Sequence, residues 1–158
     1  MPEIDRDVAQ YLEEWGILFE NFGSTRMMGK ALGWLLICSP PHQTAKEIAQ
    51  AVGGSISSMS SATRTLAQAG MIERIGLPGE RSAHFRLRSG IWTQLLKIRL
   101  GRMVDMHTLV EKGFTFTPSP TSSEAGRLRE LQSYLLFVER EFPSLLARWE
   151  QQWKEQQT

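Results

Sequence analysis

The chain has 158 residues, of which 41% are hydrophobic and 22% are charged, and its formal net charge is +1. This length suits one domain with a sizeable core and excludes a chain that is disordered by composition, while the single cysteine, Cys38, excludes an intrachain disulfide. The longest apolar run, ALGWLLIC, is too short to span a bilayer, so we expect a cytoplasmic protein without a cofactor, a metal or a membrane partner.

The first part of the chain is predicted to form short helices separated by clear breaks. Apolar residues three and four apart predict a helix over residues 5–22, and a second helix follows from about 25 to 38, where two prolines end it. Thr44, with Glu47 three residues later, forms a capping-box pattern. This pattern predicts a third helix, with the sequence AKEIAQAV, that ends at a pair of glycines.

The next stretch, GGSISSMSSATRTLAQAG, has the composition of a linker but the pattern of a helix. Met59, Ala62 and Leu66 recur at helical spacing and are expected to face inward, and Gly70 closes the helix. Two short alternating segments, MIERIGL and SAHFRLR, follow it and are joined through a Pro–Gly turn, which predicts a β-hairpin.

The last part of the chain is predicted to form two long helices. The first runs from about 91 to 114 and the second from about 123 to the C-terminus, with the proline- and serine-rich break FTPSPTSS near their junction. Pro143 is expected to kink the second helix or to mark a restart.

This order of elements predicts a mainly α fold with a small β-hairpin wing, a winged helix-turn-helix flanked by dimerisation helices. We expect three regions. Residues 1–38 hold the N-terminal helices for dimerisation and scaffold, residues 39–90 the winged helix-turn-helix core, and residues 91–158 the C-terminal dimerisation helices.

The charge distribution points to an anionic partner at the winged core. Residues 44–90 carry six basic and three acidic side chains, whereas residues 1–22 carry one basic and six acidic ones. A winged helix-turn-helix with a basic surface is expected to bind double-stranded DNA, its second helix lying in the major groove.

The side chains predicted to contact DNA lie on the serine-rich helix and on the wing. Arg64 is the long donor able to contact guanine through two hydrogen bonds, and Arg81 is placed to enter a minor groove or reach a phosphate. Two interpretations of the hydroxyls stay open, reading of bases or binding of phosphates only. The predicted DNA-binding set is Ser55, Ser57, Ser58, Ser60, Ser61, Arg64, Thr65, Arg81, Ser82 and His84.

Each feature also has a simpler interpretation. Serine-rich helices occur as plain solvated helices, and Arg81 has an acidic neighbour, Glu80, with which it can pair in a turn. His42, His84 and His107 lack metal-ligand spacing, and no nucleophile or phosphate-loop motif is present, so an enzyme is not expected. The alternative function is a winged-helix module that binds protein and not DNA.

The segment LICSPPHQTAKEIAQAVGGSISSMSSATRTLAQAGMIERIGLPGERSAHFRL resembles the winged-helix core of the MarR superfamily, in particular its GbsR-type branch. The resemblance rests on a helix that ends in SP, the EIA helix, the serine-rich helix and a PGER wing followed by an aromatic residue. It implies a homodimeric, sequence-specific DNA-binding transcriptional regulator, a repressor that binds a palindromic operator. The SAHF after Arg81 departs from the charged residues that this branch tends to have, so fewer phosphate contacts are expected at the wing.

The flanking helices are expected to form the dimer, since Trp149 and Trp153 lie four apart on a helix that would otherwise end in solvent. The alternative is that these helices pack on the first helix of the same chain. Relatives of the GbsR type imply a small-molecule effector such as a quaternary ammonium compound, which suits an aromatic cage. The aromatic residues predicted for that pocket, which are more simply interpreted as core, are Trp15, Phe19, Phe22, Trp34 and Trp92.

Overall fold

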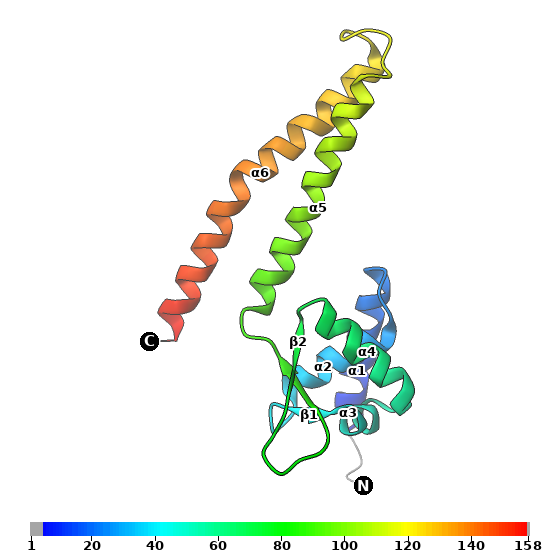
Figure 1. The fold of residues 1–158 in the computed structure, drawn as a ribbon, viewed down its shortest axis with the longest axis vertical. Helices are drawn as coiled ribbons and strands as arrows, with labels where there is room; N and C mark the ends of the chain where they lie inside the picture. The colour runs from blue at the N-terminus through cyan, green and yellow to red at the C-terminus, as the bar shows by residue number, and fades with distance from the viewer. Residues whose placement is uncertain (1–4, 158) are drawn as a thin grey trace. The chain divides into compact units, whose positions relative to one another are not determined.

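The computed structural model describes residues 5–157, apart from the side chains of Arg99, Arg102 and Val104. Residues 1–4 of the predicted N-terminal region lie outside the described part. The chain divides into two compact units, residues 1–91 and residues 92–158. The elements in order are α1 (Arg6–Asn21), α2 (Arg26–Ile37), β1 (Gln43–Thr44), α3 (Ala45–Val52), α4 (Ile56–Gln68), β2 (Ile72–Ile75), β3 (His84–Leu87), α5 (Ile91–Phe114) and α6 (Ser123–Gln156) (Figure 1).

The predicted mainly α fold with a β-hairpin is confirmed, and two details differ. The hairpin of β2 and β3 is extended by β1 to a three-stranded antiparallel sheet of order β1-β3-β2, in which Thr44 pairs with His84. A two-residue strand is too short to show alternation, so the sequence pattern could not reveal it. In addition, α6 runs through Pro143 without a restart, and Leu135 and Leu146 are buried on either side of the proline. The other alternative, a kink at Pro143, stays a prediction.

The helix-turn-helix is set by a cap at its start and glycines at its turns. The Thr44 hydroxyl accepts a hydrogen bond from the Glu47 backbone N–H, and the Glu47 carboxylate accepts one from the Thr44 N–H at 2.7 Å. The Glu47 carboxylate also accepts from the Thr44 hydroxyl at 2.8 Å, and the two hydrogen bonds that it accepts from Thr44 lower the pKa of the Glu47 carboxyl. After α3, Gly53 adopts φ +67°, and after α4, Gly70 adopts φ +71°, conformations that favour glycine.

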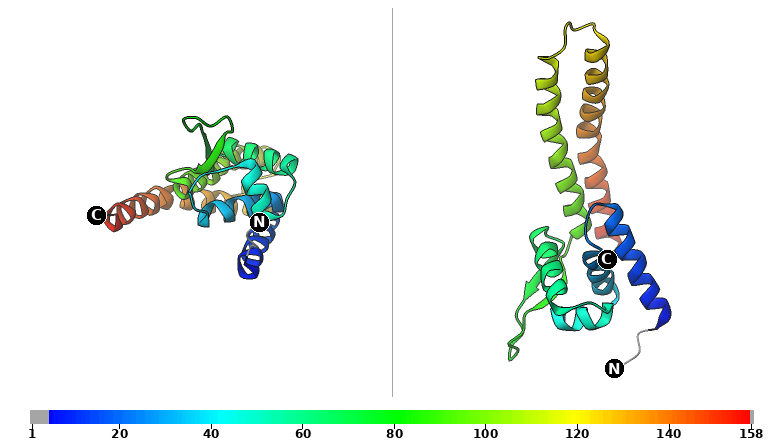
Figure 2. Two further views of the ribbon diagram at one scale, coloured as in Figure 1. Left: turned by 90° about the horizontal axis from the view of Figure 1, so that it is seen from below. Right: turned by 90° about the vertical axis from the view of Figure 1, so that its right-hand side faces the viewer.

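The core of the first unit lies beneath α4. Met59 and Leu66 on α4 are fully buried, together with Leu32, Ile48 and Ile72 from the surrounding elements. The loop between β2 and β3 projects away from the helices of this unit in both views of Figure 2. This arrangement leaves the opposite face of α4 and the wing exposed.

Helices α1 and α2 cross closely because glycines line the crossing. A Cβ on Gly29 would lie 2.2 Å from the backbone carbonyl oxygen of Trp15, and a Cβ on Gly33 would lie 2.8 Å from the Trp15 ring. Gly16, on α1, faces the side chain of Arg26 in the same way. A larger residue at Gly29 would meet the backbone of α1 and separate the two helices, whereas one at Gly16 or Gly33 would displace the side chain of Arg26 or Trp15.

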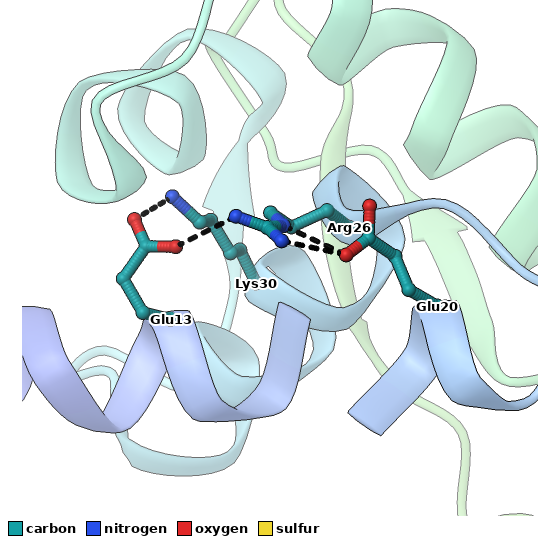
Figure 3. A network of polar contacts seen from close by, with 4 residues as sticks. All are labelled: Glu13, Glu20, Arg26 and Lys30. Carbon is teal, nitrogen blue, oxygen red and sulfur yellow. Dashed lines mark hydrogen bonds and ion pairs between the residues drawn. The ribbon is translucent and has the colours of Figure 1, made fainter. Parts of the chain in front are cut away.

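A polar network on the rim of this crossing joins the same two helices (Figure 3). Glu20 accepts hydrogen bonds from Nε and Nη2 of Arg26 at 3.0 and 2.7 Å, and these bonds raise the pKa of Arg26. Glu13 forms ion pairs with Lys30 and, at 3.9 Å, with Arg26. Because most of these groups are exposed, the network orients the helices more than it stabilises them.

In the second unit, α5 and α6 form an antiparallel hairpin (Figures 1 and 2). Lys97 and Glu150 pair at 3.5 Å, His107 Nε2 lies 3.5 Å from Glu139 Oε1, and Gln132 donates to Glu111 at 2.6 Å. Within the described residues, no helix is both long and apolar enough to cross a membrane.

The close crossing predicts that Gly29→Ala destabilises the protein by about 1–3 kcal/mol, since the new methyl group would meet the backbone of α1. The measurement is the free energy of unfolding from urea denaturation. As a control, Gly126→Ala, on α6, meets nothing nearer than the flexible end of Arg129 at 3.8 Å and should stabilise by about 0.5–1 kcal/mol. Equal stabilities of the two variants would contradict the crossing.

Candidate nucleic-acid interface

The face of α4 opposite the core is polar and carries one cation. Ser57, Ser61, Arg64 and Gln68 are all exposed and follow one another at spacings of three and four residues, so they form one stripe. Of the predicted DNA-binding residues on α4, Ser58 and Ser60 are half-buried at the edges of this stripe, and Ser55 and Thr65 are exposed.

The hydroxyl groups on α4 divide into two classes. Ser55 caps the helix by accepting from the Ser58 N–H at 3.1 Å, the Ser58 hydroxyl donates to the Ser55 carbonyl oxygen at 2.9 Å, and the Thr65 hydroxyl donates to the Ser61 carbonyl oxygen at 3.0 Å. In the described part of the chain, the side-chain hydroxyls of Ser57, Ser60 and Ser61 form no hydrogen bond. The latter three are therefore the hydroxyls with capacity for an outside partner.

A hollow of about 520 Å³ lies beside α4 and the sheet and is lined by both. Arg64 and Gln68 of α4 face it from one side, and Arg74 and Phe85 of the hairpin from the other. Arg74 also lines a neighbouring hollow of about 300 Å³ within the wing, which is lined by Glu80, Arg81 and Ser82 as well. Arg64, Arg74 and Arg81 thus follow one another from the helix to the wing.

These arginines are not neutralised by the protein itself. Within residues 5–157, the guanidinium groups of Arg64, Arg74 and Arg81 form no ion pair, and Glu80 does not pair with Arg81. By contrast, Arg86 on β3 pairs with Glu73 on β2 at 2.5 Å. The unpaired cations make this surface attractive to the phosphates of a nucleic acid.

His84, predicted as a DNA contact, lies on β3 with its side chain buried. Its side chain is only 6% exposed, its ring centroid lies 5.5 Å from that of His42, and its Nδ1 is buried without a hydrogen-bond partner. The strand β1, which the sequence pattern missed, pairs with β3 at this residue and brings His42 beside it.

Three residues of this region were not predicted from the sequence. Arg74 and Gln68 share the surface of the hollow with Arg64, and Thr63 is fully buried, its hydroxyl donating to the Met59 carbonyl oxygen at 2.9 Å. The helical series Ser57, Ser61, Arg64 and Gln68, with spacings of four, three and four, would have identified Gln68. The position of Arg74 depends on how the hairpin packs.

The aromatic residues predicted for an effector pocket do not share one environment. Trp15 packs edge-on against Tyr11 and tilted against buried Phe19, with centroids 6.3 and 6.2 Å apart, and fills the α1–α2 crossing. The Trp34 indole N–H donates to Gln43 Oε1 at 3.4 Å. The two exposed members, Phe22 and Trp92, belong to different units. The effector pocket stays a prediction.

The described residues contain no group of three histidine, cysteine or acidic side chains arranged to hold a metal ion. Burial raises the pKa of the Cys38 thiol, which keeps it protonated and a poor nucleophile. The chemistry of this surface is that of hydrogen-bond donors and cations.

A helix-turn-helix followed by a projecting hairpin, with a polar helix face and unpaired arginines, defines a winged-helix DNA-binding protein. The comparisons with known proteins agree. A family model described as an MmpR5-like MarR family transcriptional regulator matches residues 90–152. The chain is 32% identical over 145 residues to the HTH-type transcriptional regulator MmpR5 of Mycobacterium tuberculosis, covering 92% of this chain and 88% of that protein.

The chain belongs to the MarR family of transcriptional regulators. A crystal structure of a transcriptional regulator is 32% identical, with a TM-score of 0.76 and coverage of 92% of this chain and 99% of the other. A complex of MepR from Staphylococcus aureus with DNA matches more weakly, at 19% identity and a TM-score of 0.43 over 85% of this chain and 93% of that chain. These matches do not confirm the GbsR-type branch.

The position of Arg74 predicts a phosphate contact outside the recognition helix. In Arg74→Gln, the slope of the logarithm of the binding constant for random-sequence duplex against the logarithm of salt concentration should fall in magnitude by about 1. The matched control is Arg86→Gln, on the same hairpin, because Arg86 is already paired with Glu73. Equal slopes for the two variants would contradict a phosphate contact by Arg74.

Proposed function

We propose that this MarR-family regulator binds a palindromic operator as a homodimer, represses transcription there, and is released by a small molecule. The proposal is carried by one observation, the outward stripe of α4 with unbonded hydroxyls and an unpaired arginine, continued by the arginines of the wing. A dimer that covers a promoter excludes RNA polymerase sterically, so repression is the simplest consequence of binding.

In this proposal, the helix and the wing have different tasks. Arg64 reads guanine from the major groove with two hydrogen bonds, and Ser57, Ser60 and Ser61 allow α4 to approach the bases closely. Arg81, at the tip of the wing, contacts the phosphates or the minor groove of the same duplex.

The homodimer is supported by the apolar surface of the second unit. A hairpin of two helices buries few side chains, and among its described residues only Val110, Ala125, Leu135 and Leu146 are buried apolar ones. Large apolar side chains stay exposed on both helices and on the connection between them: Trp92, Ile98, Met106, Leu109, Phe116, Tyr134, Leu136, Phe137, Leu145, Trp149 and Trp153. A patch of this extent marks an interaction surface.

Most of the exposed apolar residues of α6 fall on one stripe. Tyr134, Phe137, Leu145, Trp149 and Trp153 recur at multiples of three and four, and the two tryptophan rings stack with centroids 5.9 Å apart. A two-fold symmetric dimer has two recognition helices, one for each half-site of a palindrome. A ligand that changes the spacing of those helices would release the operator.

The dimer proposal predicts that Trp149→Ala weakens self-association by at least about tenfold, since large aromatic side chains dominate such interfaces. Sedimentation equilibrium of the full chain measures the dissociation constant. Leu136→Ala is the control, because Leu136 is also exposed on α6 but points away from the stripe. Equal dissociation constants for both variants would contradict the assigned stripe.

The roles of the two arginines predict different losses. Arg64→Ala should reduce affinity for a duplex selected from a random pool by roughly 5- to 150-fold and leave binding to random-sequence DNA nearly unchanged. Arg81→Ala should weaken binding to all duplexes alike. The measurement is a binding titration with both duplexes at several salt concentrations, which also tests the alternative of a protein-binding module. Salt-independent binding, or parental affinity in both variants, would reject the DNA-binding proposal for this surface.

A further inference from the structure

The first turn of α4 exposes an isoleucine. Ile56 directly follows the N-cap Ser55, and its side chain is 56% exposed. Among the described residues of α4 it is the one large apolar side chain on the surface, since Met59 and Leu66 are fully buried. A β-branched residue gains little from helix propensity, so helix formation does not account for an isoleucine here.

The other polar groups of the same turn are already used. The hydroxyls of Ser55 and Ser58 lie 2.8 Å apart and bond to each other, and each also bonds to the backbone of the other residue. The turn therefore offers an outside partner two side chains, the unbonded hydroxyl of Ser57 and the hydrocarbon of Ile56. In helix-turn-helix proteins this N-terminal part of the recognition helix is the part that meets the base edges.

The chemistry of Ile56 selects its partner among the groups in the major groove. An isoleucine side chain can neither donate nor accept a hydrogen bond, so it gains nothing from the polar edges of guanine, cytosine or adenine. The apolar group that the major groove displays is the C5-methyl group of thymine. Contact between two hydrocarbon groups removes both from water, which is favourable in proportion to the apolar area buried.

We propose that Ile56 is a specificity-determining residue that reads thymine in the operator through its C5-methyl group. The proposal rests on the proposed DNA-binding function and deepens it, because it adds a preference for a base that no hydrogen-bonding residue of α4 would supply. Ile56 lies one turn before Ser60 and so shares the edge of the stripe on which Ser60 lies. Its side chain is longer than that of serine and can reach a methyl group that a serine hydroxyl does not.

The test removes single methyl groups from the DNA. Full-length protein selects duplexes from a pool with a randomised core that spans two half-sites, and the selected duplex is then made with each thymine replaced in turn by deoxyuridine. Base pairing is kept and one methyl group is lost. At the position read by Ile56, the parent should bind the deoxyuridine duplex about fourfold more weakly.

The protein side of the test uses three variants. Ile56→Ala should bind the thymine and deoxyuridine duplexes equally at that position, and Ile56→Val should keep part of the difference. Ile37→Ala is the matched control and should keep all of it, because Ile37 is similarly exposed, at 47%, in the same unit but lies at the end of α2. Thermal unfolding of each variant checks that it is folded.

The outcomes separate the inference from the function on which it rests. If the parent selects a sequence with salt-dependent affinity but binds every deoxyuridine duplex as tightly as its thymine counterpart, the reading of thymine is refuted and DNA binding stands. A thymine preference that survives in Ile56→Ala also refutes it. If no sequence is selected, the proposed function fails and this inference fails with it. Because the parent is compared on two duplexes, the result does not depend on the folding of any variant.

Discussion

The burial of one face of α4 is the constraint on which the rest of this surface depends. Met59 and Leu66 are fully enclosed, so α4 cannot rotate without moving large apolar side chains into water. With the inner face fixed, the position of every outward side chain is decided by the helical period alone. The Ser55 cap and Gly70 then set where the helix begins and ends. Specific chemistry at the surface is therefore a consequence of packing beneath it.

The sequence predicts this fold well where local signals are strong. Capping residues, glycines with positive φ and apolar spacing are all short-range features, and the predicted helices agree with the observed ones to within about two residues. What failed depends on contacts between distant segments. The pairing of β1 with β3 joins residues some 40 positions apart, and His84, which takes part in it, is buried. The alternation of residues along β3 by itself does not reveal that the His84 side chain is buried.

The same division applies to the candidate site. Arg64 and the serines could be predicted because they follow the period of one helix. Which hydroxyls remain available could not, since it depends on hydrogen bonds such as that between the Ser55 and Ser58 hydroxyls at 2.8 Å. Similarly, the sequence shows arginines along the hairpin but not that Arg86 is paired with Glu73 while Arg74 has no acidic partner in the described chain. The number of charged residues can be read from the sequence, whereas the ion pairs that they form depend on the tertiary structure.

In the homodimer that we propose, the exposed hydrocarbon of the α5–α6 hairpin has a consequence for the regulator's abundance in the cell. A unit whose apolar side chains are covered mainly by a second copy has a folding free energy that varies with protein concentration, through mass action. At low expression the hairpin is left uncovered, and chaperones and proteases act on such surfaces. Degradation would then remove single chains faster than paired ones. The amount of active regulator would rise more steeply than its rate of synthesis, which gives a threshold to its response without any additional component.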